Sequence, residues 1–255
     1  MIKFFRKIRQ NSLSDGKTGK YLKYAIGEIV LVVIGILIAL QINDWSSFRN
    51  ERKLEQNLLH SLTAEFERNL IELDRDHKLN LSSQNAALVL MQDDRLSYPP
   101  SKTDSLIGTV LNYATFDART GTYDETIASG NLKLIQDDNL KELLGQWTGE
   151  LNDLGDDVII RREHLIHHVS PTLRKFIPLR NYDKANYRED YDRELVIKPF
   201  KVPQSSYTNL YNSLEVDGVL YEMYLNQTFV TVNEVSLELY IQEVIKLLEE
   251  NIQND

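Results

Sequence analysis

The 255-residue sequence contains no cysteine, and it has only 6 prolines and 11 glycines. The absence of cysteine excludes a disulfide framework, thiol catalysis, iron–sulfur clusters, cysteine-ligated zinc and a lipoprotein anchor. The low glycine and proline content excludes collagen-like and low-complexity chains. The nucleotide-binding and nucleophile motifs G-x-G-x-x-G, G-x-x-x-x-G-K-[ST] and G-x-S-x-G are also missing. We therefore expect no enzymatic activity and no cofactor.

The remaining composition is that of a globular protein. Charged residues make up 26% and hydrophobic residues 42% of the chain, which excludes wholesale disorder. The length suits one domain of about 200 residues together with an attachment segment.

Charge is distributed unevenly along the chain. Residues 1–24 hold seven basic residues and one acidic residue, whereas residues 46–255 hold 22 basic and 35 acidic residues. An acidic body repels phosphate groups, so nucleic acid is not an expected partner. A basic head before an acidic body is typical of a chain whose two parts lie in different compartments.

A long apolar run separates the two parts. Every residue from Ile29 to Leu40 is apolar or glycine. A helix from Tyr21 to Trp45 would be about 37 Å long, and the hydrocarbon core of a bilayer is about 30 Å thick. Tyr21, Tyr24 and Trp45 would lie at the two interfaces. The run therefore predicts a membrane-spanning helix in contact with the lipid bilayer.

Two other interpretations of this run stay open. It could be a buried core helix, or a cleaved signal peptide whose best cleavage site, ending at Ala39, has leucine at the outer position. With an uncleaved anchor, the positive-inside rule places residues 1–23 in the cytoplasm and residues 46–255 across the membrane. The predicted organisation is a basic head (1–23), a transmembrane helix (24–45) and an acidic helical periplasmic domain (46–255).

The N-terminal sequence resembles a known family. Its blocks are Met1–Arg9 and Tyr24–Asn43, which reads YAIGEIVLVVIGILIALQIN, followed by Trp45. They resemble an uncharacterised family of single-pass membrane proteins of Bacteroidota, catalogued as a domain of unknown function. The resemblance recurs at Thr122–Ile135. It implies a Gram-negative inner membrane and a periplasmic domain, and it brings no activity and no catalytic residues.

The body reads as helices joined by short connections. Leucine and other apolar residues fall at helical spacing in residues 46–92, 104–113, from 137 or 138 to Pro171, 205–214 and 217–252. The spacing of Thr122 and Glu125 is that of a capping box, and Gly130 suits a helix end. Residues 178–206 read as an irregular loop, with one short strand at 195–197 as an option. We expect an all-α fold in which the transmembrane helix continues into an elongated antiparallel bundle.

One face of the apolar run is a candidate membrane contact. Glu28, Val32, Gly35 and Ala39 share a helix face, and Gly35 and Ala39 form a small-xxx-small pair. This face could pair with another copy or with a membrane protein partner. Alternatively, Glu28 is solvated near the cytoplasmic interface, or it pairs with Lys20 or Lys23.

The histidine cluster is the weak metal candidate of the sequence. Glu163 and His167, and likewise His164 and His168, are four residues apart and could share a metal on a helix face. The H-E-x-x-H order of metalloproteases is absent. A solvated or bundle-edge patch is therefore the simpler interpretation.

Two further segments are candidate binding surfaces. Tyr123, Asp124 and Ser129 could line a ligand or partner pocket against Trp147, or they could serve only to cap and pack a short helix. The tyrosines and arginines between residues 180 and 193 could form an interface or a loop packed over the bundle.

These features favour a non-enzymatic scaffold or accessory protein over a ligand-binding sensor. A head of about 20 residues is too short for an output domain, so a sensor would have to signal through a partner. A closed apolar cavity in the bundle would favour the sensor, and a large exposed apolar patch would favour the scaffold. Converging carboxylates around the histidines would favour a metal-dependent enzyme.

Overall fold

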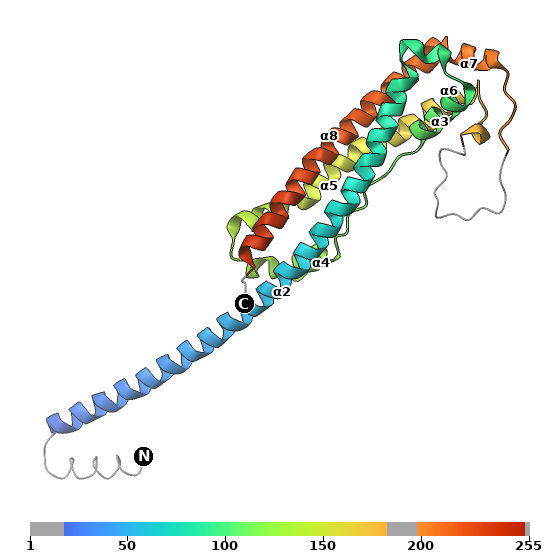
Figure 1. The fold of residues 1–255 in the computed structure, drawn as a ribbon. Helices are drawn as coiled ribbons and strands as arrows, with labels where there is room; N and C mark the ends of the chain where they lie inside the picture. Colours follow the sequence, from blue (N-terminus) through green and yellow to red (C-terminus); the bar gives the residue numbers. More distant parts are fainter. Residues whose placement is uncertain (1–17, 183–197, 253–255) are drawn as a thin grey trace. The chain divides into compact units, whose positions relative to one another are not determined.

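The computed structural model describes residues 18–182 and 198–252, and the described residues are almost entirely helical and contain no strand (Figure 1). The predicted all-α class is confirmed. The basic head up to residue 17, the optional strand at 195–197, and Tyr187 and Tyr191 lie outside the described residues. The helices are α2 Thr18–Leu90, α3 Pro100–Leu111, α4 Gly121–Ala128, α5 Asp138–His164, α6 Ser170–Leu173, α7 Gln204–Tyr211 and α8 Leu214–Asn251, with 3-10 turns η1 Asp93–Ser97, η2 Asn131–Leu134 and η4 Leu179–Asn181, and the π-helical turn η3 Leu165–Val169.

The chain divides into two compact units, residues 1–57 and 58–255. In the first unit, the apolar residues of α2 are exposed, and Leu31, for example, is 72% accessible. Among the described residues, α2 is the one helix long and apolar enough to cross a membrane, and the apolar window lies near the N-terminus. An exposed apolar surface of this length is what a helix surrounded by lipid requires.

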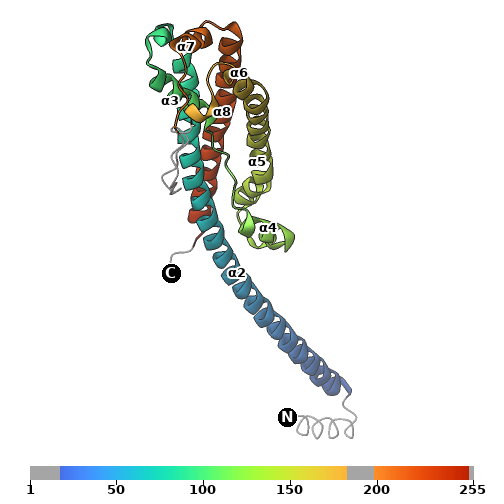
Figure 2. The same cartoon turned by 90° about the vertical axis from the view of Figure 1, so that its right-hand side faces the viewer.

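The second unit is a bundle formed by residues 58–90 of α2 together with α5 and α8 (Figure 2). Helix α8 is antiparallel to α2, because Gln84 contacts Thr228 (2.7 Å) while the earlier His77 contacts the later Glu234 (2.9 Å). It is also antiparallel to α5. Accordingly, α2 and α5 run in the same direction.

A parallel pair of helices needs a connection that returns along the bundle. Residues 112–120 form it as an extended strand-like segment without strand pairing, here called the crossover, which links α3 at one end to α4 at the other (Figures 1 and 2). Two asparagines of α2 hold it. Asn80 accepts from the Ala114 amide (3.0 Å), and Asn69 both accepts from and donates to the backbone of Arg119 (2.8 and 2.9 Å).

Local signals in the sequence set most helix ends. Helix α5 begins at Asp138, within its predicted start, and the Asp137 carboxylate caps it by accepting from the Leu140 amide (3.0 Å). Gly130 adopts the left-handed conformation (φ 71°) after α4, also as expected. Helix α3 begins at Pro100, four residues before its predicted start, because proline fits the first turn of a helix.

The predicted capping box of α4 is wrong. The helix begins at Gly121 with Thr120 as the N-cap, so Thr122 lies inside the first turn. The free amides of Thr122 and Tyr123 donate instead to the buried carboxylate of Glu65 on α2, at 2.6 and 3.0 Å. The contact with Glu65 therefore satisfies the helix N-terminal amides in place of the predicted capping box.

Two apolar clusters form the interior of the bundle. The first surrounds Trp147, whose ring lies between Phe66 and Tyr240 with centroids 4.9 and 5.9 Å away. The second contains residues of α3, α7 and the adjacent ends of the long helices. The described ends of the predicted loop are tied together, because the Asn181 side chain accepts from the Phe200 amide (2.8 Å) and donates to its carbonyl (3.2 Å).

Candidate functional site

The outer face of α8 carries a row of exposed apolar side chains, which we call the α8 stripe: Tyr221, Leu225, Phe229, Val232, Val235 and Leu239. Phe229 is 59% and Leu239 63% accessible. The steps of three or four residues keep the row on one side of the helix.

The opposite face of the same helix is also apolar. Val216, Leu220, Met223, Val230 and Leu237 are buried against the bundle. A helix at the surface of a soluble domain is typically apolar on one side only, and a helix that is apolar on both sides is typically enclosed. The α8 stripe thus has the composition of a contact surface.

A buried polar network joins the three long helices and the crossover. Its members are Asn80, Arg161, Gln227 and Glu234, each at most 1% accessible, together with the backbone of Ala114. Arg161 donates to Asn80 Oδ1 (3.0 Å), to Gln227 Oε1 (3.3 Å) and to the Ala114 carbonyl (3.0 Å). Asn80 in turn donates to Glu234 (2.5 Å).

Burial changes the acid–base properties of both charged members of this network. It lowers the pKa of Arg161 to about 10, a shift that the nearby Glu234 charge partly offsets, so the guanidinium is protonated at neutral pH. Burial raises the pKa of Glu234, against the hydrogen bonds from His77 and Asn80 and the charge of Arg161. The Arg161 guanidinium also lies 4.5 Å from the centre of the Tyr113 ring. Because the network is shielded from solvent, it holds the fold and does not present a ligand site.

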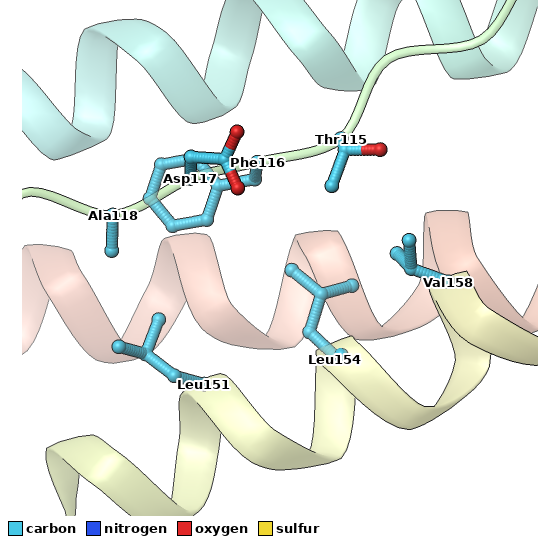
Figure 3. A pocket seen from close by; sticks show the side chains of 8 residues that line it. Thr115, Phe116, Asp117, Ala118, Leu151, Leu154 and Val158 are labelled. Atoms are coloured by element: carbon cyan, nitrogen blue, oxygen red, sulfur yellow. The ribbon is translucent and has the colours of Figure 1, made fainter.

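A small pocket lies between the crossover and α5 (Figure 3). Leu151, Leu154 and Val158 of α5 face the crossover residues across it. Its volume is about 230 Å³, and it is not an enclosed cavity. Sites for small organic ligands are typically roughly 300–1,000 Å³ and enclose most of the ligand. The full lining is Thr115, Phe116, Asp117, Ala118, Leu151, Leu154, Gly155 and Val158.

The histidine cluster divides into separate contacts. His167 pairs with Glu163 (3.1 Å) at the surface, and the buried His164 contacts the Val219 carbonyl (3.0 Å) and Glu222 (3.4 Å) on α8. The His168 ring stacks on that of His164, with centroids 5.3 Å apart. In the described parts of the chain, no three histidine, aspartate or glutamate side chains are placed to hold a metal ion together.

The residues predicted around Tyr123 lie in two environments. Tyr123 and Trp147 belong to the same apolar cluster, and the Tyr123 hydroxyl contacts Thr148 Oγ1 (3.4 Å). Asp124 and Ser129 are exposed and make local hydrogen bonds, with the Thr120 hydroxyl and the Glu125 carbonyl respectively (both 2.7 Å). The arrangement is that of a packed and capped helix end.

The four residues proposed as membrane contacts are all exposed. Glu28, Val32, Gly35 and Ala39 lie in the first unit, and a Cβ added at Gly35 would meet nothing within 4 Å. The surface is thus open to close approach by another helix, and its pairing stays a prediction.

Comparison with known proteins gives a match to a protein family over part of the chain. No curated protein and no solved structure matches the chain significantly. A family model described as a family of unknown function, DUF6090, matches residues 28–146. The matched region runs from the apolar part of α2 into α5 and stops before α8. Over these 119 residues the chain is similar to that family, for which no activity is described.

Proposed function

We propose that this protein is a non-enzymatic interaction protein of the bacterial inner membrane. In this proposal α2 anchors the chain, residues 1–23 are cytoplasmic, and the helical body is periplasmic and binds a protein partner through the α8 stripe. The observation that carries the proposal is the stripe itself. Six large apolar side chains in one row on the surface of an otherwise well-packed bundle are typical of a protein interface.

The charge pattern supports the proposed orientation. Basic residues precede the apolar run and acidic residues dominate after it, which favours a cytoplasmic N-terminus. The exposed apolar surface of α2 supports a membrane-spanning segment. The alternative, a periplasmic sensor, receives less support because the pocket beside the crossover is small and open.

The orientation is tested with reporter fusions after Asp255. A reporter enzyme that is active only in the periplasm should be active there, and one that is active only in the cytoplasm should be silent. The same pair fused after Lys23 should give the opposite pattern. Cytoplasmic activity of the Asp255 fusion would contradict the proposed topology.

The interaction is tested by exchanging Phe229 for glutamate. The tagged full chain, purified from native membranes in gentle detergent, should recover a stoichiometric partner, and Phe229→Glu should reduce that recovery at least tenfold. An aromatic anchor at the centre of an interface typically contributes about 2 kcal/mol or more. Phe229 is exposed, so the substitution should leave folding intact.

The matched control is Ile71→Glu. Ile71 is 70% accessible, lies on α2 outside the stripe, and offers the same chemical change. Circular dichroism checks the fold of both variants. Equal recovery of the partner by Phe229→Glu and by the unchanged chain would remove the stripe from the proposed function.

A further inference from the structure

We propose that the partner contacts the α8 stripe with an amphipathic helix whose apolar face is flanked by lysine and arginine, and that it is not a second copy of this chain. This inference deepens the proposed function and rests on it. It follows from the charges that border the stripe.

The borders of the stripe are acidic at both ends. Asp217 and Glu222 flank its beginning, and Glu238 and Glu243 flank its end. Asp217 pairs with Arg95 (3.3 Å) and Glu222 contacts His164 (3.4 Å), yet acidic side chains still outnumber basic ones along α8. Helix α8 carries eight acidic residues and one basic residue, Lys246, which pairs with Glu243 at 3.1 Å. Flanking charges of paired helices select the partner, so these borders favour a basic one.

A second copy of the chain meets like charges in either orientation. In a parallel pair, Asp217 of one copy would face Glu222 of the other, and Glu238 would face Glu243. In an antiparallel pair, the Asp217 end of one stripe would face the Glu243 end of the other. Repulsion of this kind disfavours self-association while leaving the apolar surface available to a different partner.

A lipid surface is disfavoured by the same charges. Anionic headgroups attract basic segments and repel acidic ones. An apolar row bordered by carboxylates therefore fits a protein better than a membrane.

The size of the stripe sets the scale of the contact. From Tyr221 to Leu239 it extends over about 27 Å of helix, which one partner helix of about 18 residues would cover. A single helix on a single exposed face forms an interface at the small end of the range, and so a reversible complex is expected.

The test uses the full chain in nanodiscs of neutral lipid and two designed helical peptides. Both peptides carry the same leucine and isoleucine stripe, one with lysine and one with glutamate on its flanks. The lysine peptide should bind at least tenfold more tightly at low salt, and the difference should shrink at high salt because the flanks are exposed. Phe229→Glu should abolish the binding of both.

Charge-reversal variants distinguish the effect of the acidic residues beside the stripe from the effect of the net charge of the chain. Glu222→Lys combined with Glu243→Lys leaves two acidic and two basic border residues and should remove the preference for the lysine peptide. The control pair, Glu142→Lys with Asp153→Lys on α5, changes the net charge equally and should keep the lysine preference. Equal binding of the two peptides to the unchanged chain, or no binding of either, would overturn the inference.

Binding of a second copy of the chain and binding of the lipid surface, the two alternatives disfavoured above, can each be measured directly. Because the chain has no cysteine, Phe229→Cys gives a single thiol, and oxidation should produce no more disulfide dimer than Ile71→Cys. A strong dimer specific to Phe229→Cys would identify a second copy as the occupant. A fluorophore on the same thiol that is quenched by a lipid-borne quencher would identify the membrane.

Failure of this inference is distinct from failure of the proposed function. A native partner that is lost with Phe229→Glu, together with equal binding of the two peptides, retains the interaction function and rejects the basic flanks. Recovery of the partner that does not depend on Phe229 rejects both.

Discussion

Replacing Arg161 with methionine should lower the free energy of unfolding by about 3–5 kcal/mol, because it removes a buried cation that donates three hydrogen bonds and leaves their buried acceptors unsatisfied. The variant would take the positive charge of Arg161 away from the buried Glu234 carboxylate, which would keep its contact with His77 (2.9 Å). It would also remove the hydrogen bonds that Arg161 donates to the side-chain oxygens of Asn80 and Gln227 and to the Ala114 carbonyl. Chemical denaturation of the full chain in detergent, followed by circular dichroism, measures the change.

Two comparisons isolate the buried charge. Arg162 is the next residue on α5 and is exposed, so Arg162→Met should change the stability by less than about 0.5 kcal/mol. Adding Glu234→Gln to Arg161→Met should cost less than the sum of the two single changes, because the second substitution removes the buried negative charge that Arg161 offsets. Additive losses would mean that the two charges do not stabilise each other.

Replacing Trp147 with alanine should also cost about 3–5 kcal/mol, because it removes the largest side chain of the first apolar cluster. Phe66 and Tyr240, which contact the indole on two sides, cannot both close the cavity. The same denaturation measurement applies. Trp45→Ala in the first unit is the control, since Trp45 is 63% accessible.

Trp147→Phe should be far less costly than Trp147→Ala. The indole N–H is buried without a partner among the described residues, and an unsatisfied buried donor costs about 1–3 kcal/mol. Phenylalanine removes that cost while keeping most of the packing. Equal losses for the phenylalanine and alanine variants would contradict the packing argument.

Most helices could be predicted because their signals are local. Apolar residues at helical spacing located α5 and α8, and Asp137 and Gly130 marked ends that the structure confirms. The crossover was not predicted, because residues 112–120 have no periodic pattern and their course depends on Asn69 and Asn80, far away in the sequence.

The candidate sites were less accessible to sequence reasoning. A signal for buried polar groups on α2, Asn80 of the network among them, was present, since Asn69, Asp76, Asn80 and Ser83 recur at steps of three, four or seven on the same side of α2 as Phe66. Which distant side chains they meet depends on the packing of α5 and α8. The α8 stripe was also readable in outline, because the residues between 216 and 241 are apolar on two sides of a helix.

The contact between α2 and α8 has a consequence for the order in which the chain acquires its structure. Residues 58–90 leave the ribosome well before α8, yet Asn80 and His77 contact Glu234, more than 150 residues later. During synthesis, the part of α2 that packs against α8 therefore stays uncovered until α8 has been made. A nascent chain of this kind depends on factors that shield apolar surfaces. A chain truncated before residue 214 would lack α8, so the surface of α2 that α8 covers would stay exposed and would continue to need such factors.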